Sequence, residues 1–108
     1  MENQTVNEGK TMAIISYITI FGTVAALIMN SSKKNSFTAF HIRQMIGLTL
    51  LGMVNQYIIT KFLGGTAGMI IAVILFVLWV IGIVGAIQGK EKAIPVLGEQ
   101  FQDWFKNI

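Results

Sequence analysis

Long stretches without a single charged residue constrain this chain more than any other feature. The longest comprises 28 residues, from Phe62 to Gly89, and two others comprise 19 residues (11–29) and 17 residues (44–60). A soluble chain of only 108 residues leaves much of its surface in water and could not cover so many apolar side chains. In lipid, a lone strand would leave its backbone groups without hydrogen-bond partners, so each stretch is expected to be helical. The sequence therefore predicts an all-α integral membrane protein.

The lengths of these stretches predict a bundle of three transmembrane helices. A helix of about 20 residues, rising about 1.5 Å per residue, crosses the roughly 30 Å hydrocarbon core. We expect the spans at about 11–29, 40–60 and 67–88, within a transmembrane domain of residues 11–89. Residues 1–10 are polar and are predicted to form a flexible N-terminal tail. A cleaved signal peptide is the alternative for the first stretch, but it would follow a basic start, not an acidic-leaning one.

The C-terminal segment, residues 90–108, is predicted to be cytoplasmic and to contain a short amphipathic helix. Beyond Pro95, which suits the first turn of a helix, apolar residues recur on one helical face while the other face is polar. The apolar face includes Phe101, Trp104 and Phe105, and such aromatic residues often lie at a membrane surface. These three residues are candidate membrane-surface anchors. The alternative is that the helix packs on the protein's own bundle.

Basic residues predict the orientation of the chain in a cell membrane. With three spans, the first loop and the C-terminal segment share one side of the bilayer, and together they carry six Lys or Arg residues. The other side has only Lys10 and Lys61. Because positively charged loops stay in the cytoplasm, we expect a multi-pass protein with its N-terminus outside and its C-terminus in the cytoplasm.

The distribution of reactive residues argues against an enzyme. No Asp or Glu lies between residues 9 and 90, and the chain has no Cys and a single His. Paired carboxylates, an activated nucleophile and a set of zinc ligands are therefore missing from the apolar region. We predict no catalytic, cofactor-binding or metal-binding residues. The basic residues flank apolar stretches and the net charge is only +3, which indicates contact with the lipid bilayer and not with nucleic acid.

Polar residues of the second predicted span form the main candidate site. His41, Gln44 and Asn55 lie on one broad helical face, and Arg43 lies at the entry to the span, where it can reach the headgroups. Because such groups are unfavourable against lipid, this face is expected to turn into the bundle. Two interpretations are open: a polar seam that contacts a substrate or partner, or hydrogen bonds between the protein's own helices.

Small residues recur along the third predicted span at a spacing that allows membrane helices to approach closely. Gly64, Gly68 and Ala72 follow one another at every fourth position, as do Gly82 and Ala86. This pattern predicts either a homo-oligomer or close packing inside one chain.

The entry to the second span resembles a known protein family. The stretch KKNSFTAFHIRQ (33–44), above all its element Phe40-His41-x-Arg43-Gln44, is similar to small bacterial membrane proteins related to the channel-forming import component of the chloroplast inner-envelope translocon. The resemblance covers about residues 9–105 and departs from the family pattern at Ser36, where many relatives carry Pro. It implies a helical membrane fold, no enzyme activity and a link to protein translocation.

Two functional hypotheses follow. The first, implied by the resemblance, is a structural or accessory subunit linked to protein translocation that acts through other membrane proteins. The alternative is a small homo-oligomeric channel or transporter, which would have to work without the intramembrane carboxylates that usually couple transport to ions.

Overall fold

The computed structural model describes residues 2–91, 93–95 and 97–107. Every regular element in this part of the chain is helical, which confirms the predicted all-α class. The elements are α1 (Glu2–Ile18), α2 (Ile20–Lys33), α3 (Ser36–Val54), the π-helical turn η1 (Asn55–Ile59), α4 (Thr60–Leu63), α5 (Gly65–Ile87) and α6 (Gly98–Trp104).

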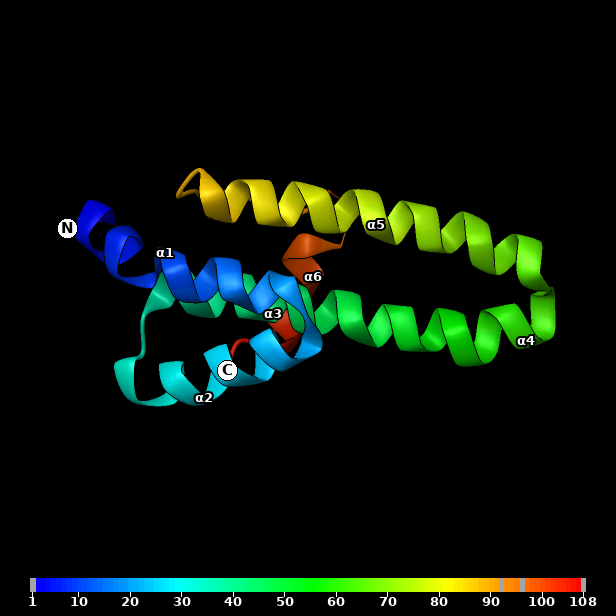
Figure 1. Cartoon of the computed structure of the whole chain (residues 1–108), viewed down its shortest axis with the longest axis horizontal. Coiled ribbons are helices and arrows are strands. Elements are labelled where there is room, and N and C mark those ends of the chain that lie inside the picture. The colour runs from blue at the N-terminus through cyan, green and yellow to red at the C-terminus, as the bar shows by residue number, and fades with distance from the viewer. Residues whose placement is uncertain (1, 92, 96, 108) are drawn as a thin grey trace.

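The first apolar stretch does not form one long helix. Between α1 and α2, Thr19 has an extended backbone (φ −150°, ψ 171°), and its side-chain oxygen accepts a hydrogen bond from the N–H of Gly22 at 3.2 Å. This is the arrangement of a helix N-cap. The chain reverses here, so that α1 and α2 pack together as a hairpin (Figure 1). The single span expected over 11–29 is thus replaced by two helical arms, because a cap inside the apolar run divides it.

Small and hydroxylated residues close the turn of this hairpin. Thr23 Oγ1 donates a hydrogen bond to the carbonyl oxygen of Ser16 at 2.6 Å. Gly22 lies so close to the carbonyl oxygen of Ile15 that an added Cβ would overlap it. A larger residue at position 22 would therefore force the two arms apart.

Two helical stretches are long and apolar enough to cross a membrane. The first is Ser36–Leu63, 28 residues that comprise α3, η1 and α4, and the second is α5, with 23 residues. They include the predicted range 40–60 and all but the last residue of the predicted range 67–88. Gly64 joins them with a φ of +96°, which glycine adopts without strain. The two helices run antiparallel (Figure 1).

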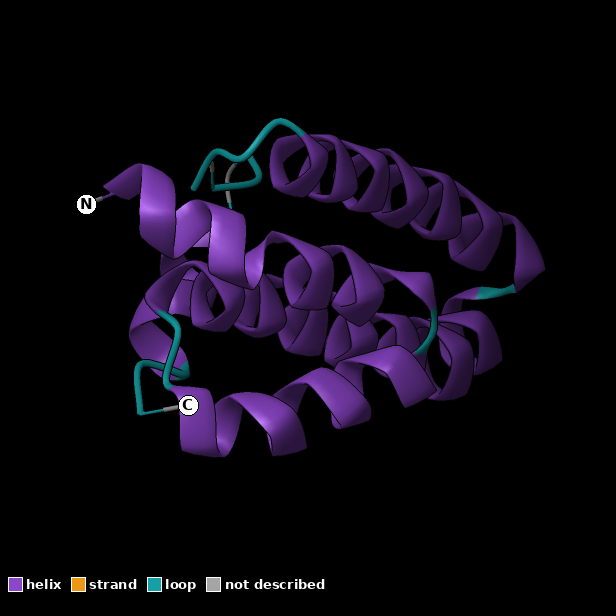
Figure 2. Cartoon of the chain, turned by 60° about the vertical axis from the view of Figure 1, so that its left-hand side comes forward, coloured by secondary structure: helices purple, strands orange, loops and turns teal. Residues whose placement is uncertain are grey.

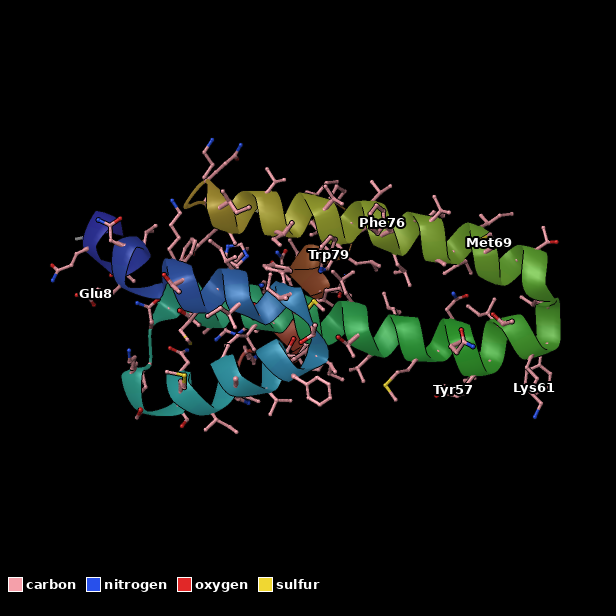
Figure 3. All side chains as sticks on the ribbon, viewed as in Figure 1. Glu8, Tyr57, Lys61, Met69, Phe76 and Trp79 are labelled. Carbon is pink, nitrogen blue, oxygen red and sulfur yellow. The ribbon has the colours of Figure 1, made fainter. Side chains whose placement is uncertain are left out.

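The outer half of this helical pair exposes large apolar side chains. Tyr57, Phe62, Met69 and Phe76 are 69, 74, 67 and 62% exposed, and Figure 3 shows Tyr57 and Met69 on the part that projects beyond the other helices. Such a surface is unfavourable in water and is solvated by lipid. This surface favours a membrane location, whereas the third crossing expected from the sequence is not confirmed.

The remaining helices pack at the other end of the pair. There α1, α2 and α6 lie against the first part of α3, and α1 also contacts α5 (Figures 1 and 2). One core cluster contains Tyr17 and Phe37, and a second contains Leu48, Ile94 and Phe101. We call this five-helix part of the molecule the packed end.

Both chain ends lie at the packed end, away from the Gly64 turn (Figure 1). Residues 2–10, for which the sequence predicts a flexible tail, form the first turns of α1. One contact that holds them is made by Asn35, whose Nδ2 donates a hydrogen bond to the carbonyl oxygen of Thr5 at 2.9 Å. The start of the chain is therefore part of the bundle.

The small residues of α5 are used for packing inside the chain. Gly68 contacts Thr60, and Gly82 contacts the ring of Tyr17, whose Cε1 would lie 2.9 Å from an added Cβ. Gly85 is also buried. Internal packing thus explains these positions, and the homo-oligomer stays a prediction.

Candidate functional site

A buried hydrogen-bond network joins α1 to α3. At its centre is Tyr17, a fully buried residue of α1. Its hydroxyl oxygen lies 2.6 Å from Nδ1 of His41 and 2.9 Å from Nε2 of Gln44, and both of these α3 residues are also fully buried. His41 and Gln44 lie about one helical turn apart, so both side chains reach the same hydroxyl.

The outer ends of the network hold the segment that follows α5. Nε2 of His41 lies 2.9 Å from the carbonyl oxygen of Lys90. Oε1 of Gln44 accepts a hydrogen bond from the backbone N–H of Ile94 at 2.7 Å. Two side chains of α3 therefore fix the chain at both ends of the stretch 90–94.

The partners determine the direction of each hydrogen bond. A carbonyl oxygen only accepts, so Nε2 of His41 carries a proton and donates it to Lys90. In a neutral imidazole Nδ1 then accepts, and it receives the hydroxyl proton of Tyr17. The same hydroxyl oxygen accepts from Gln44. The result is an unbroken chain of donors and acceptors around a neutral histidine.

Aromatic side chains surround the network. Phe37 and Phe40 meet the ring of His41 edge to face, with ring centroids 4.8 and 5.0 Å away. From α5, the indole Nε1 of Trp79 donates a hydrogen bond to the backbone carbonyl oxygen of Tyr17 at 2.7 Å. The network and its surroundings therefore connect α1, α3, α5 and the segment 90–94.

The residues of the predicted polar seam are divided between separate places. His41 and Gln44 meet in the network, whereas Arg43 points to the C-terminal segment. Arg43 donates hydrogen bonds of 3.1–3.3 Å to three oxygen atoms of residues 102–106. In both places the hydrogen bonds join parts of this chain. This favours bonding within the protein over a polar seam that contacts a substrate or partner.

Asn55 lies in the outer half of the helical pair, apart from the network. It begins the π-helical turn η1, and its Nδ2 donates a hydrogen bond to the carbonyl oxygen of Gly68 at 3.0 Å. Its buried Oδ1 has no hydrogen-bond partner among the described residues. The side chain thus joins the two candidate spans through one of its two polar atoms.

The three predicted membrane anchors have different surroundings. Phe101 is 2% exposed and packs against Gly47 of α3, so it is a core residue and not a surface anchor. Trp104 is 63% exposed, and Phe105 is partly buried. Helix α6 therefore packs on the bundle, which is the alternative that the sequence left open, and it presents Trp104 outward.

Tyr17 is the site residue that the sequence analysis missed. It lies inside the first uncharged stretch, where a buried hydroxyl needs a hydrogen-bond partner. The need for a partner could have indicated Tyr17 as a site residue. Its partners, however, lie 24 and 27 positions further along the chain. They become neighbours only when α1 packs on α3.

The Tyr17 network positions separate parts of the chain relative to one another. Within residues 2–91, 93–95 and 97–107, no three His, Asp or Glu side chains gather closely enough to hold a metal ion. The network contains one imidazole, one phenol and one carboxamide, each bonded to another part of the chain. The arrangement fixes the backbone at Lys90 and Ile94 on the bundle.

A family model matches residues 8–101, a range that includes both candidate spans, most of the α1–α2 hairpin and the whole network. It describes the magnetosome magnetite crystal formation protein family (MamF/MmsF). The chain belongs to this family. No significant match was found among curated proteins or among solved structures.

Membership of the magnetosome family corrects the resemblance drawn from the sequence. The matching family is not the one related to the chloroplast import component, so the hypothesis of a translocation subunit is wrong. The alternative of a channel or transporter has no support from this family either. The family and the two apolar helices agree with a membrane location, and this part of the predicted localisation is confirmed.

Proposed function

We propose that this chain is a membrane-embedded protein that takes part in the formation of magnetite crystals at a magnetosome membrane. The observation that carries the proposal is the family match over residues 8–101, which covers nearly all of the folded helices. The exposed apolar surface of the two candidate spans supports an integral position, with lipid as its partner.

The described residues favour a contribution made through shape and surface and not through a resident iron site. They contain no cluster of three His, Asp or Glu side chains, which together form typical iron sites. The network of Tyr17, His41 and Gln44 instead fixes the segment 90–94 on α3. We therefore propose that the bundle presents Lys90 and the α2–α3 connection, Lys34 and Asn35, at one membrane surface, without a cofactor and without an enzymatic step.

Mineral formation in vesicles tests this proposal. The purified chain would be reconstituted in lipid vesicles, and magnetite would be precipitated at their surface from ferrous and ferric iron at alkaline pH. We expect a shifted and narrower distribution of crystal diameters, measured by electron microscopy, because a repeated protein surface would make nucleation more uniform. Vesicles that hold an unrelated membrane protein with two spans are the control. Identical distributions in the two preparations would contradict the proposed function.

We also propose that both chain ends lie on the same side of the membrane. Both arms of the α1–α2 hairpin lie at the packed end, and among the described residues Ser36–Leu63 and α5 are the helices that are long and apolar enough to cross. Basic residues gather at the packed end: Lys10, Lys33, Lys34, Arg43, Lys90 and Lys106. Lys61 lies at the opposite end, beside the turn (Figure 3). The packed end is then cytoplasmic, whereas the expectation of an outside N-terminus depended on three crossings.

Single-cysteine labelling distinguishes two crossings from three. The chain has no Cys, so each introduced thiol is labelled without background. With a membrane-impermeant maleimide, Asn7→Cys and Ser31→Cys are expected to react from the same side, and Thr66→Cys from the opposite side. Three crossings would instead make Asn7→Cys react together with Thr66→Cys, and that result would overturn the proposed topology.

A further inference from the structure

An open pocket lies between α2, the start of α3 and the C-terminal residues. Its volume is about 770 Å³, within the range of ligand-binding pockets. Asn30, Ser31 and Ser36 line it on the side of the α2–α3 connection, and Leu27 and Ile28 line it on α2. The pocket therefore combines a polar wall with an apolar one.

Two cationic side chains, Lys34 and Arg43, line this pocket, and none of the described residues that line it is acidic. Lys34 is exposed at the C-cap of α2. Among the described residues, Arg43 bonds to neutral oxygens of the C-terminal segment, and these bonds leave its positive charge uncancelled. These bonds use three of its five N–H groups, which leaves two for a ligand. Glu8 lines a neighbouring pocket of about 410 Å³, together with Lys33.

The position of the pocket relative to lipid narrows the choice of ligand. Ile28 lines it and is 65% exposed, and Phe21 and Val24, which precede it on α2, are 82 and 49% exposed. The apolar wall is therefore continuous with a surface that suits acyl chains. The cationic wall lies beside the α2–α3 connection, Lys34 and Asn35, and such side chains suit the level where headgroups meet water. A ligand that fits both walls has an anionic head and an apolar chain.

We propose that this pocket binds the phosphate group of an anionic membrane lipid. Lys34 and Arg43 contact the phosphate, Asn30 and Ser36 provide polar contacts around it, and Leu27 and Ile28 contact the first part of the acyl chain. The site rests on the proposed membrane location of the chain. It does not depend on magnetite formation or on the number of crossings.

Thermal unfolding of the full chain in detergent tests the site. The probes are phosphatidylglycerol and phosphatidylcholine with the same short acyl chains, and inorganic phosphate. Because a ligand that binds only the folded state raises the unfolding midpoint more when it binds more tightly at a given concentration, phosphatidylglycerol is expected to raise it most. An equal rise of the unfolding midpoint with phosphatidylcholine would contradict a role for the net negative charge of the lipid. An equal shift with inorganic phosphate would show a free-anion site and overturn the lipid assignment.

Lys34→Asn is the first variant to examine. Lys34 has φ +51° and ψ +41°, and Asn adopts this left-handed conformation readily, so the substitution removes the charge without straining the backbone. The dissociation constant of phosphatidylglycerol is expected to rise about fivefold. Lys61→Asn removes the same charge at the opposite end of the molecule and is expected to leave binding unchanged. Equal dissociation constants for the two variants would contradict the site.

Variants of Arg43 provide a second and independent measurement. Arg43→Lys keeps the charge and is expected to retain most of the lipid-dependent shift, whereas Arg43→Gln is expected to lose it. Both variants lose bonds to the C-terminal segment, so a change in stability alone would affect them similarly. A lipid-dependent shift that is the same in both variants would show that the charge of Arg43 does not take part.

Discussion

Replacing Gln44 with leucine is expected to lower the free energy of unfolding by about 2–3 kcal/mol. The substitution roughly keeps the side-chain volume but removes two hydrogen bonds, one from the N–H of Ile94 and one to the hydroxyl of Tyr17. Ile94 is 2% exposed, so its N–H would stay buried without a partner. Unfolding by SDS in mixed micelles, followed by far-UV circular dichroism, measures the change.

Gln56→Leu is the matched control for this prediction. Gln56 lies on the same continuous helical stretch, but its side chain is exposed and lies outside the Tyr17 network. Its replacement is expected to change the free energy of unfolding by less than about 0.5 kcal/mol. Similar losses in the two variants would show that the network does not contribute specifically to stability.

The two candidate spans could be predicted from the sequence because their signal is local. The uncharged stretch 44–60 lies within Ser36–Leu63, and the stretch 62–89 includes the Gly64 turn and the whole of α5. In lipid only a helix satisfies the backbone of such a segment, so length and composition are sufficient. The all-α class follows from the same property of lipid and requires no knowledge of packing.

The hairpin of α1 and α2 could not be predicted from hydropathy. Apolar composition is equally compatible with one helix of 19 residues and with two arms joined by a cap. Two arms form because Thr19 acts as the N-cap of α2 and because Gly22 tolerates the close approach of the Ile15 carbonyl. A threonine followed three positions later by glycine is a weak signal, because both residue types are common in membrane helices.

Helical spacing predicts that polar residues of α3 share one face, but it does not predict their hydrogen-bond partners. His41 and Gln44 do share a side of the helix, yet they bond to Tyr17 and to the backbone of residues 90–94. Arg43, one position before Gln44, points instead to the C-terminal segment. Long-range contacts of this kind leave no periodic pattern in a single sequence.

The resemblance of Phe40-His41-x-Arg43-Gln44 to import-component relatives was misleading for a physical reason. Each polar member of this element bonds to another part of the same chain. Phe40 contributes an edge-to-face contact with His41 and a carbonyl oxygen that accepts from Gln102. The element therefore describes how the bundle is assembled, and an assembly motif does not specify a function.

Phe101→Ala is expected to lower the free energy of unfolding by about 3–5 kcal/mol. Phe101 is 2% exposed and forms a core cluster with Leu48 and Ile94, so its removal leaves a cavity beneath α6. Because α6 has only seven residues, it depends on this packing and should detach from α3. The same micelle unfolding experiment measures the loss, and hydrogen exchange of the α6 amides reports the detachment. Trp104→Ala, on the exposed side of α6, is expected to cause a much smaller loss.

Variants of Gly47 test whether the loss of stability in Phe101→Ala comes from the contact between the Phe101 ring and Gly47. An added Cβ at Gly47 would overlap the Phe101 ring, so Gly47→Ala alone is expected to destabilise the protein by about 1–3 kcal/mol. Without the ring the overlap disappears, and alanine is the better helix former by about 1 kcal/mol. In the Phe101→Ala background, Gly47→Ala should therefore be neutral or stabilising. Residues in contact give such non-additive effects, whereas strictly additive losses would mean that α6 does not rest on Gly47.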